Sequence, residues 1–110
     1  MNSRAKGARG EREWAAYLRD RGYMARRGQQ FCGGPDSPDV VCEGLPLHWE
    51  VKRVQNLNLR AALLQAVTEA PEGKVPVVAH RRDREQWLIT LRADDFFDLL
   101  RGIENAPQRP

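Results

Sequence analysis

Cysteine and histidine are scarce in this chain of 110 residues, which contains two of each. Cys32 and Cys42 are not grouped with histidines, and His48 and His80 have no ligand-like spacing to each other or to the cysteines. This pattern argues against a zinc framework, which needs several correctly spaced ligands. Intracellular thiols also usually stay reduced. We therefore expect both cysteines to be packing residues and both histidines to be structural or exposed.

Long apolar runs are absent as well. No segment approaches the roughly 18 residues that a membrane span needs, and the N-terminus lacks the apolar core of a secretory signal. We expect a soluble, cytoplasmic protein. The length of 110 residues suits one compact domain. We place this domain over 1–102 and expect 103–110 to form a frayed tail.

The charge is small in total but unevenly distributed. The formal net charge is +3, whereas basic residues gather near the N-terminus. This basic group consists of Arg4, Lys6, Arg9, Arg12, Arg19, Arg21, Arg26 and Arg27. An arginine-rich half indicates a polyanionic partner such as nucleic acid. For any single arginine, the commoner alternative is a charge that solvates a helix surface.

Hydrophobic periodicity and turn residues predict an α/β protein with the order helix, three strands, helix, two strands, helix. The first expected helix covers 10–21 and stops at Gly22, and the second covers 59–70 and is capped by Asn58. A last helix ends at Gly102. The expected strands cover 23–28, 39–42, 47–53, 75–80 and 86–91, and a loop covers 29–38. The second and third strands should pair as a hairpin. We expect a mixed sheet flanked by helices.

Two carboxylates and a lysine carry the clearest chemical signal. Asp39 begins one strand of the expected hairpin, and Glu50 and Lys52 lie on the other. Because strand side chains alternate, Glu50 and Lys52 share a face, and Asp39 can meet Glu50. Magnesium prefers such oxygen ligands, with water and substrate phosphate completing its octahedron. The alternative is an ordinary ion pair between Glu50 and Lys52, with Asp39 as a turn residue.

Glu11 joins this group because of its phase on the first helix. At about 100° per residue, it lies between Trp14 and Ala15, on the apolar stripe. Glu13 falls among polar positions, so we expect it at the surface. An inward carboxylate is costly unless it is paired or bound to metal. Glu11 is therefore the better candidate for a site.

The pattern Pro38-Asp39, a turn and then Glu50-Val51-Lys52 resembles the PD-(D/E)XK nuclease signature. A wider match resembles the archaeal Holliday junction resolvases, often called Hjc. It covers the first half strongly, and the second half mainly by the order of elements and Trp87. After Arg27 the resolvases usually carry a serine-containing segment, whereas this chain has a longer insertion. The matching residues are Lys6-Gly7-Ala8-Arg9-Gly10-Glu11-Arg12-Glu13, Leu18, Gly22-Tyr23, Arg27, Asp39-Val40-Val41 and Glu50-Val51-Lys52.

The resemblance implies a dimeric endonuclease of the restriction-endonuclease-like fold that cuts four-way DNA junctions with magnesium, for which manganese can substitute. The implied catalytic residues are Glu11, Asp39, Glu50 and Lys52. The metal ligands would be Asp39, Glu50, the carbonyl of Val51 and Glu11. Arg12 and Arg27 match arginines near the DNA, and we expect Arg26 to contact phosphates beside them.

Three functions remain open from the sequence. The first is a structure-selective endonuclease such as a junction resolvase. The second is another PD-(D/E)XK nuclease, such as a nickase, exonuclease or restriction subunit. The third is a catalytically silent DNA-binding module. The complete set of four catalytic residues argues against the third, and the lack of an added recognition domain argues against restriction.

Two further features suggest contacts with DNA and with a second chain. Gln65 lies on the polar side of the second helix, where related nucleases often place a residue near the scissile phosphate. A solvated helix surface is at least as good an explanation. The last helix has more apolar residues than one face needs, which favours a homodimer interface, with core packing as the alternative. These apolar residues are Phe96, Phe97, Leu99 and Leu100.

Overall fold

The computed structural model describes residues 3–28 and 39–104, with side chains from Gly7 onward. Its helices are α1 (Ser3–Asp20), α2 (Leu59–Glu69) and α3 (Ala93–Glu104). Its strands are β1 (Ala25–Arg27), β2 (Val40–Cys42), β3 (Leu47–Arg53), β4 (Val75–Arg81) and β5 (Leu88–Thr90). The predicted α/β class and the order αβββαββα are confirmed. The expected loop over 29–38, Cys32 within it, and residues 105–110 of the expected tail lie outside the described residues.

One mixed sheet of five strands, in the order β1-β2-β3-β4-β5, forms the centre of the described structure. Strands β3 and β4 are parallel, and the other neighbouring pairs are antiparallel. A parallel pair needs a crossover connection, which α2 provides. The predicted hairpin is confirmed, because β2 pairs with β3 and places Val40 opposite Trp49. Asp39, which directly precedes β2, therefore lies beside the middle of β3.

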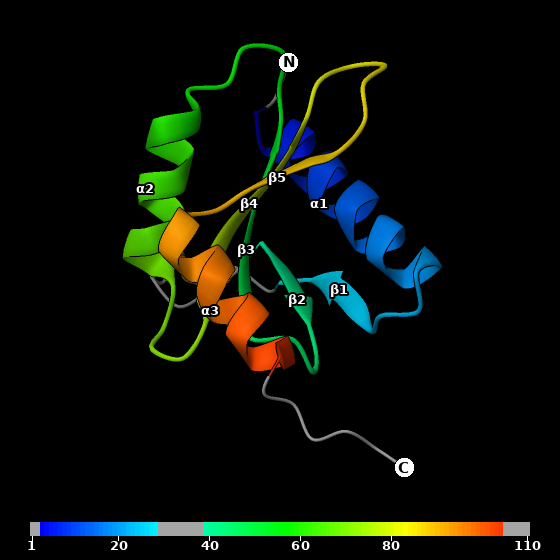
Figure 1. Ribbon diagram of the computed structural model, residues 1–110. Coiled ribbons are helices and arrows are strands. Elements are labelled where there is room, and N and C mark those ends of the chain that lie inside the picture. Colours follow the sequence, from blue (N-terminus) through cyan, green and yellow to red (C-terminus); the bar gives the residue numbers. More distant parts are fainter. Residues whose placement is uncertain (1–2, 29–38, 105–110) are drawn as a thin grey trace.

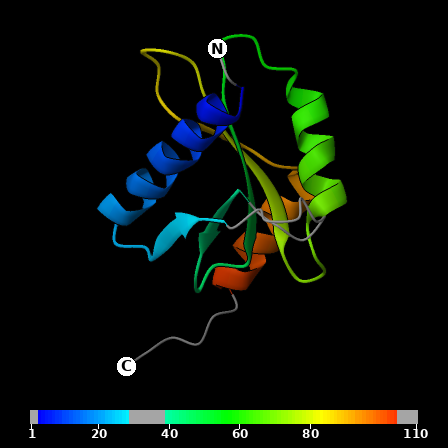
Figure 2. The ribbon, with the colours of Figure 1, turned by 180° about the vertical axis from the view of Figure 1, so that it is seen from behind.

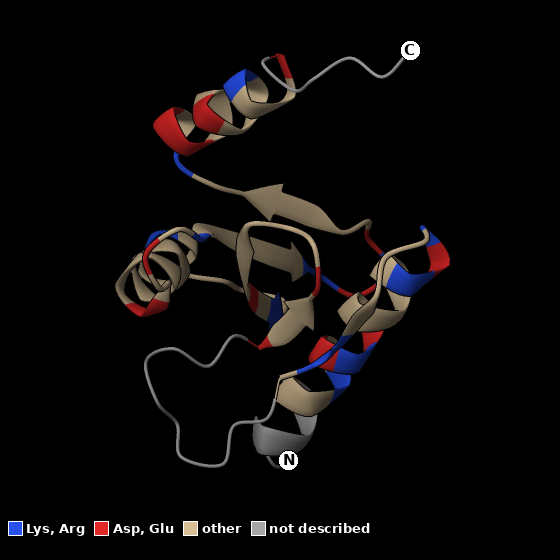
Figure 3. Ribbon diagram, turned by 90° about the horizontal axis from the view of Figure 1, so that it is seen from below, with Lys and Arg blue, Asp and Glu red and all other residues tan. Residues whose placement is uncertain are grey.

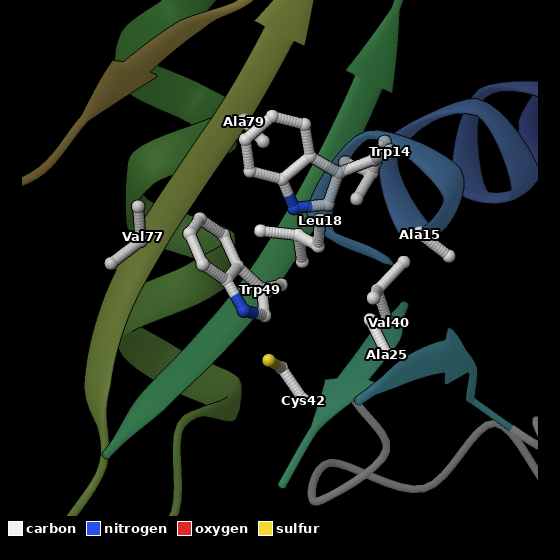
Figure 4. Packing of buried hydrophobic residues seen from close by; sticks show 10 residues of the cluster. Trp14, Ala15, Leu18, Ala25, Val40, Cys42, Trp49, Val77 and Ala79 are labelled. Carbon is white, nitrogen blue, oxygen red and sulfur yellow. The ribbon is translucent and has the colours of Figure 1, made fainter. Parts of the chain in front are cut away.

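Helix α1 covers one face of the sheet and α2 covers the other (Figure 1, Figure 2). The main core lies on the α1 side, where the ring centroids of Trp14 and Trp49 are 5.0 Å apart (Figure 4). Its burial of Cys42 agrees with the expected packing role of that residue. The buried members of this core are Trp14, Ala15, Leu18, Ala25, Val40, Cys42, Trp49, Val51, Val77 and Ala79.

A smaller cluster lies on the α2 side and consists of Ala62, Ala66 and Val78. Side chains alternate along β3, so the residues that alternate with Trp49 and Val51 face this second side. These residues are polar, namely His48, Glu50 and Lys52. The predicted cap of α2 is confirmed, since the Asn58 side chain accepts a hydrogen bond from the Ala61 N–H at 3.1 Å.

A Schellman motif ends α1. Gly22 has a φ of 92°, and its N–H donates to the Arg19 carbonyl at 2.9 Å. The N–H of Tyr23 donates to the Leu18 carbonyl at 3.1 Å. This pair of bonds satisfies carbonyls that the helix leaves without partners, and glycine adopts the required left-handed conformation without strain. The predicted stop at Gly22 is therefore confirmed.

Several predicted boundaries were wrong. Helix α1 begins at Ser3 and not at residue 10, because Gly7 and Gly10 have low helix propensity and hide the helix in the sequence. Helix α3 continues to Glu104, because Gly102 is not among the residues with positive φ and does not cap the helix. Strands β1 and β5 are shorter than expected, since an edge strand has hydrogen-bonded neighbours on one side only.

Helix α3 stands apart from the two packed layers. It lies beyond β5 at the margin of the molecule (Figure 3), and none of its residues is buried. Its first turn carries Asp94 and Asp95, whose charges are favourable at the positive end of a helix. Neither α3 nor any other helix in the described ranges is both long and apolar enough to span a membrane.

Gly10 allows α1 to approach β3 closely. A Cβ atom built on Gly10 would lie 2.6 Å from the Cβ of Arg53. The Arg53 Cβ is fixed to the strand backbone, so it cannot rotate away as the end of a long side chain could. Glycine at this position therefore brings the next residue of the helix, Glu11, close to the hairpin.

We predict that Gly10→Ala lowers the free energy of unfolding by about 1–3 kcal/mol, the usual cost of overpacking. Gly7→Ala is the matched control, because it lies in the same helix and a Cβ there would meet nothing within 4 Å. It should stabilise the chain by up to about 1 kcal/mol, since alanine has the higher helix propensity. Urea denaturation measures both effects. Equal stability of the two variants would show that α1 and β3 are not in tight contact.

Candidate metal and catalytic site

Asp39 is fixed at the hairpin by contacts with β3. Its backbone N–H donates to the Trp49 carbonyl at 3.1 Å. Its side-chain Oδ2 accepts a hydrogen bond from the Val51 N–H at 2.8 Å. These two bonds bracket Glu50, so the carboxylates of Asp39 and Glu50 are held next to each other. The structure thus brings together the two carboxylates that the sequence placed on neighbouring strands.

Glu50 is a buried carboxylate with one weak cationic neighbour. It is 2% exposed, and its Oε1 lies 3.7 Å from the Nζ of Lys52. Its Oε2 is buried without a hydrogen-bond partner among the described residues. Burial first, and then the charge of Asp39, raise the pKa of Glu50 to about 9. Without an added cation, Glu50 is therefore protonated at neutral pH.

Glu11 points inward, as its helix phase predicted. It is 8% exposed, and its Oε2 lies 3.0 Å from the Nη2 of Arg27 and accepts a hydrogen bond from the Arg27 Nε at 3.1 Å. Burial and the charge of Asp39 raise the pKa of Glu11, whereas Arg27 lowers it. Asp39 therefore acts electrostatically on both Glu11 and Glu50. The arginine that we expected near DNA is here paired with a candidate catalytic residue.

Glu13 is not the simple surface carboxylate that we expected. It forms ion pairs with Arg53 at 2.9 Å, with Arg81 at 3.4 Å and with Arg9 at 3.6 Å. Its side chain is 26% exposed. The sequence could not show this role, because Arg53 and Arg81 come from strands distant in the chain. Glu13 connects α1 to β3 and β4.

The remaining candidates lie at the surface. Arg12 and Arg26 are exposed, and charges of both signs occur along α1 (Figure 3). Gln65 is exposed on α2 and donates from its Nε2 to the Glu69 Oε1 at 3.4 Å. His80 has the structural position that we expected, since its Nε2 lies 2.9 Å from the Thr90 hydroxyl.

The residues at the hairpin fit a divalent cation. Asp39 and Glu50 offer hard oxygen ligands, and the buried Oε2 of Glu50 has no hydrogen-bond partner among the described residues. When both are ionised, the two carboxylates repel each other, and this repulsion, after burial, raises the pKa of Glu50. A cation would offset this repulsion and satisfy the buried oxygen. The site thus has the ligand chemistry that magnesium requires.

Comparison with solved structures connects this fold to a known resolvase. Hjc of Archaeoglobus fulgidus, a Holliday junction resolvase from an archaeal hyperthermophile, is 30% identical in sequence, with 78% of this chain and 72% of that chain covered and a TM-score of 0.59. This chain belongs to the Hjc-like family of PD-(D/E)XK nucleases. The predicted resemblance and the restriction-endonuclease-like fold are confirmed. Comparisons with protein-family models and with curated proteins found no match.

The sequence of this Hjc-like chain did not reveal two further residues beside Glu50. His48 is 2% exposed on β3, and Glu69 lies at the end of α2. One potential ligand atom from each of His48, Glu50 and Glu69 lies within 4.8 Å of the others. Alternation along β3 places His48 on the face of Glu50, but only the folded position of α2 brings Glu69 to it.

The raised pKa of Glu50 predicts an unusual dependence of stability on pH. Between the ordinary value of 4.5 and the folded value of about 9, the unfolded chain has released a proton that the folded chain retains. Stability of this Hjc-like chain should therefore fall as pH rises through this range in EDTA. Glu50→Gln removes the ionisable group and with it this loss of stability. At pH 8 the substitution should therefore raise the melting temperature by about 4 °C or more.

Thermal melts of the wild type and of Glu50→Gln at pH 5 and pH 8 measure this effect. Glu43→Gln is the control, because Glu43 is exposed just after β2 and should leave the pH dependence unchanged. If Glu50→Gln melts at the wild-type temperature at both pH values, the pKa of Glu50 is not raised.

Proposed function

We propose that this chain is a magnesium-dependent endonuclease that cuts branched DNA, as a Holliday junction resolvase does. The observation that carries the proposal is the meeting of Asp39, Glu50 and Lys52 at the hairpin of a chain in the Hjc-like family. The alternatives are another PD-(D/E)XK activity, such as a nickase, exonuclease or restriction subunit, and a catalytically silent DNA-binding module. The carboxylate of Asp39 beside the buried carboxylate of Glu50 favours a catalytic metal site over the silent module.

Asp39 and Glu50 would hold the metal, with the Val51 carbonyl as a third ligand and Glu11 as a ligand to a bound water or a second metal. Magnesium, or manganese in its place, would supply a lower pKa for the attacking water and charge neutralisation at the phosphate. Asp39 would keep its position while it binds the metal, because its Oδ2 accepts a hydrogen bond from the Val51 N–H at 2.8 Å.

Lys52 supplies a movable positive charge beside the reacting phosphate. Its side chain is 29% exposed, while the Glu50 side chain next to it is 3% exposed. Lysine therefore reaches from the buried carboxylate toward solvent, where the scissile phosphate would lie. From there its ammonium group orients the attacking water or neutralises the charge that develops on the phosphate.

Three arginines would hold the DNA backbone. Arg12 and Arg26 are exposed, and the side chain of Arg27 is 43% exposed even while it is paired with Glu11. Contacts of this type position a duplex through its phosphates without reading its bases. A phosphate that approaches Arg27 would compete with Glu11 for the guanidinium group.

We predict that Asp39→Asn reduces cleavage in magnesium by roughly 100-fold or more, the scale of losing one charge-stabilising group. DNA binding should survive, because the arginines are unchanged. The substrates are labelled junction, flap, nicked, single-stranded and linear duplex DNA, and cleavage and gel-shift assays are run side by side. Glu43→Gln, an exposed carboxylate beyond the other end of β2, is the control and should cut normally.

Each outcome of the substrate panel has a definite meaning. Preferential cutting of the junction by the wild type supports the resolvase, whereas equal cutting of all substrates indicates a general nuclease. Cleavage by Asp39→Asn at the wild-type rate would remove Asp39 from the site. No cleavage of any substrate by the wild type, together with tight binding, would favour the silent module.

The proposed enzyme acts as a homodimer through β5 and α3. A junction must be cut on two strands, and a two-fold dimer presents two equivalent sites to a roughly two-fold substrate. Several apolar side chains of β5 and α3 are exposed, and exposed apolar side chains that form a patch mark interfaces. They are Leu88 (59% exposed), Ile89 (51%), Phe96 (45%), Phe97 (52%) and Ile103 (72%). Of the expected interface residues, Phe97 is exposed, whereas Leu100 is partly buried.

We predict that Phe97→Glu converts the dimer to a monomer at micromolar concentration, because it places a charge among these exposed apolar side chains. Leu64→Glu is the matched control, since Leu64 is 66% exposed but lies on α2. Light scattering should report about twice the chain mass for the wild type and Leu64→Glu, and one chain mass for Phe97→Glu. A dimeric Phe97→Glu, or a monomeric wild type, would contradict this interface.

A further inference from the structure

A histidine and two glutamates converge between β3 and α2. His48 and Glu50 are two positions apart on β3 and share its α2-facing side. Glu69 is the last residue of α2. One nitrogen of His48 and one carboxylate oxygen from each glutamate lie within 4.8 Å of one another. Three potential ligands from two packed elements thus surround one point.

The surroundings of these residues favour a bound cation. His48 and Glu50 are each 2% exposed, and the Oε2 of Glu50 is buried with no hydrogen-bond partner among the described residues. Glu50 and Glu69 bring two carboxylate groups to the same point, so their charges repel each other when both are ionised. The neighbours compensate weakly, because Lys52 is 3.7 Å from Glu50 and the Gln65 bond to Glu69 is 3.4 Å long.

We propose that His48, Glu50 and Glu69 form a second divalent-cation site that prefers a transition metal such as Zn²⁺ or Mn²⁺ over Mg²⁺. This site lies on the α2 side of Glu50, and Asp39 is not one of its ligands. Glu50 is shared between it and the hairpin site. The proposal concerns metal binding by the free chain, so it does not depend on whether the chain cuts DNA.

The ligand types decide the preference for the metal. An imidazole nitrogen with two carboxylates suits zinc and its neighbours in the first transition row, whereas magnesium favours an all-oxygen octahedron. Zinc binds nitrogen and oxygen at about 2.0–2.2 Å in a tetrahedral arrangement, so its ligand atoms lie roughly 3.4 Å apart. The three potential ligand atoms, which lie within 4.8 Å of one another, would therefore move closer together by up to about 1.4 Å when the ion binds.

A cation at this site would have two consequences for the rest of the molecule. It would offset the repulsion between the carboxylates of Glu50 and Glu69, because its positive charge would lie between them. It would also connect the C-terminal end of α2 to β3 through a bond that the apolar contacts of Ala62 and Ala66 do not provide. A metal bound at this second site would thus stabilise Glu50, the shared ligand, for metal binding at the hairpin site.

The test is equilibrium dialysis of Zn²⁺ against the full chain without DNA, in excess Mg²⁺. The wild type should retain one tightly bound Zn²⁺ per chain. Glu69→Gln should weaken Zn²⁺ binding about 10-fold or more, since it removes a charged ligand. It should fold normally, because Glu69 is partly exposed. Glu72→Gln is the control, an exposed glutamate just beyond α2 that should leave binding unchanged.

Two additional variants locate the ion. Asp39→Asn should keep the Zn²⁺, because Asp39 belongs only to the hairpin site. X-ray absorption of the zinc-loaded chain should show one imidazole ligand, present in His80→Gln and absent in His48→Gln. Circular dichroism before loading verifies that each variant is folded.

The proposal is overturned if Glu69→Gln and Glu72→Gln bind Zn²⁺ equally well, or if excess Mg²⁺ displaces the ion. It is also overturned if Asp39→Asn loses the Zn²⁺ while Glu69→Gln keeps it, since the ion would then occupy the hairpin site. Absence of DNA cleavage by the wild type would count against the proposed function alone. The two failures are therefore distinguishable.

Discussion

The alternation of side chains along β3 is the constraint on which the rest of the structure depends. Trp49 and Val51 face α1 and belong to the main core, so the strand cannot rotate or slip by one residue without burying the wrong face. Glu50 is then forced to the opposite side. The Val51 N–H meanwhile donates to the Asp39 carboxylate at 2.8 Å. Apolar packing on one face thus positions the carboxylates on the other.

This arrangement is costly for the metal-free protein. A carboxylate that is 2% exposed, next to a second carboxylate, costs folding free energy unless it takes up a proton or a cation. The contrast with Glu13 is instructive, since that glutamate is surrounded by arginines and has three ion pairs. Glu13 has the environment of a structural residue. Glu50 has the environment of a binding site.

The features that could be predicted from the sequence are those that depend on short-range patterns of residues. The hairpin, the inward phase of Glu11 and the cap at Asn58 all follow from periodicity and turn residues within one or two elements. The contacts that the sequence missed join distant elements, such as Glu69 with His48 and Glu11 with Arg27. The early start of α1 was hidden because Gly10 looks unfavourable for a helix. Glycine is needed at this position because the helix approaches Arg53 closely, and that contact exists only in the folded chain.

Asp39 has a central electrostatic position between the other two carboxylates. After burial, its charge is the next cause that raises the pKa of both Glu11 and Glu50, whereas Glu11 is paired with Arg27 and Glu50 lies beside Lys52. A cation bound at Asp39 would reduce the repulsion on both neighbours at once, so their ionisation would be coupled to metal binding. Each ionised neighbour would in turn strengthen the hold on the cation. A bound cation would thus offset the carboxylate charges of the site, which lowers the cost of keeping them buried.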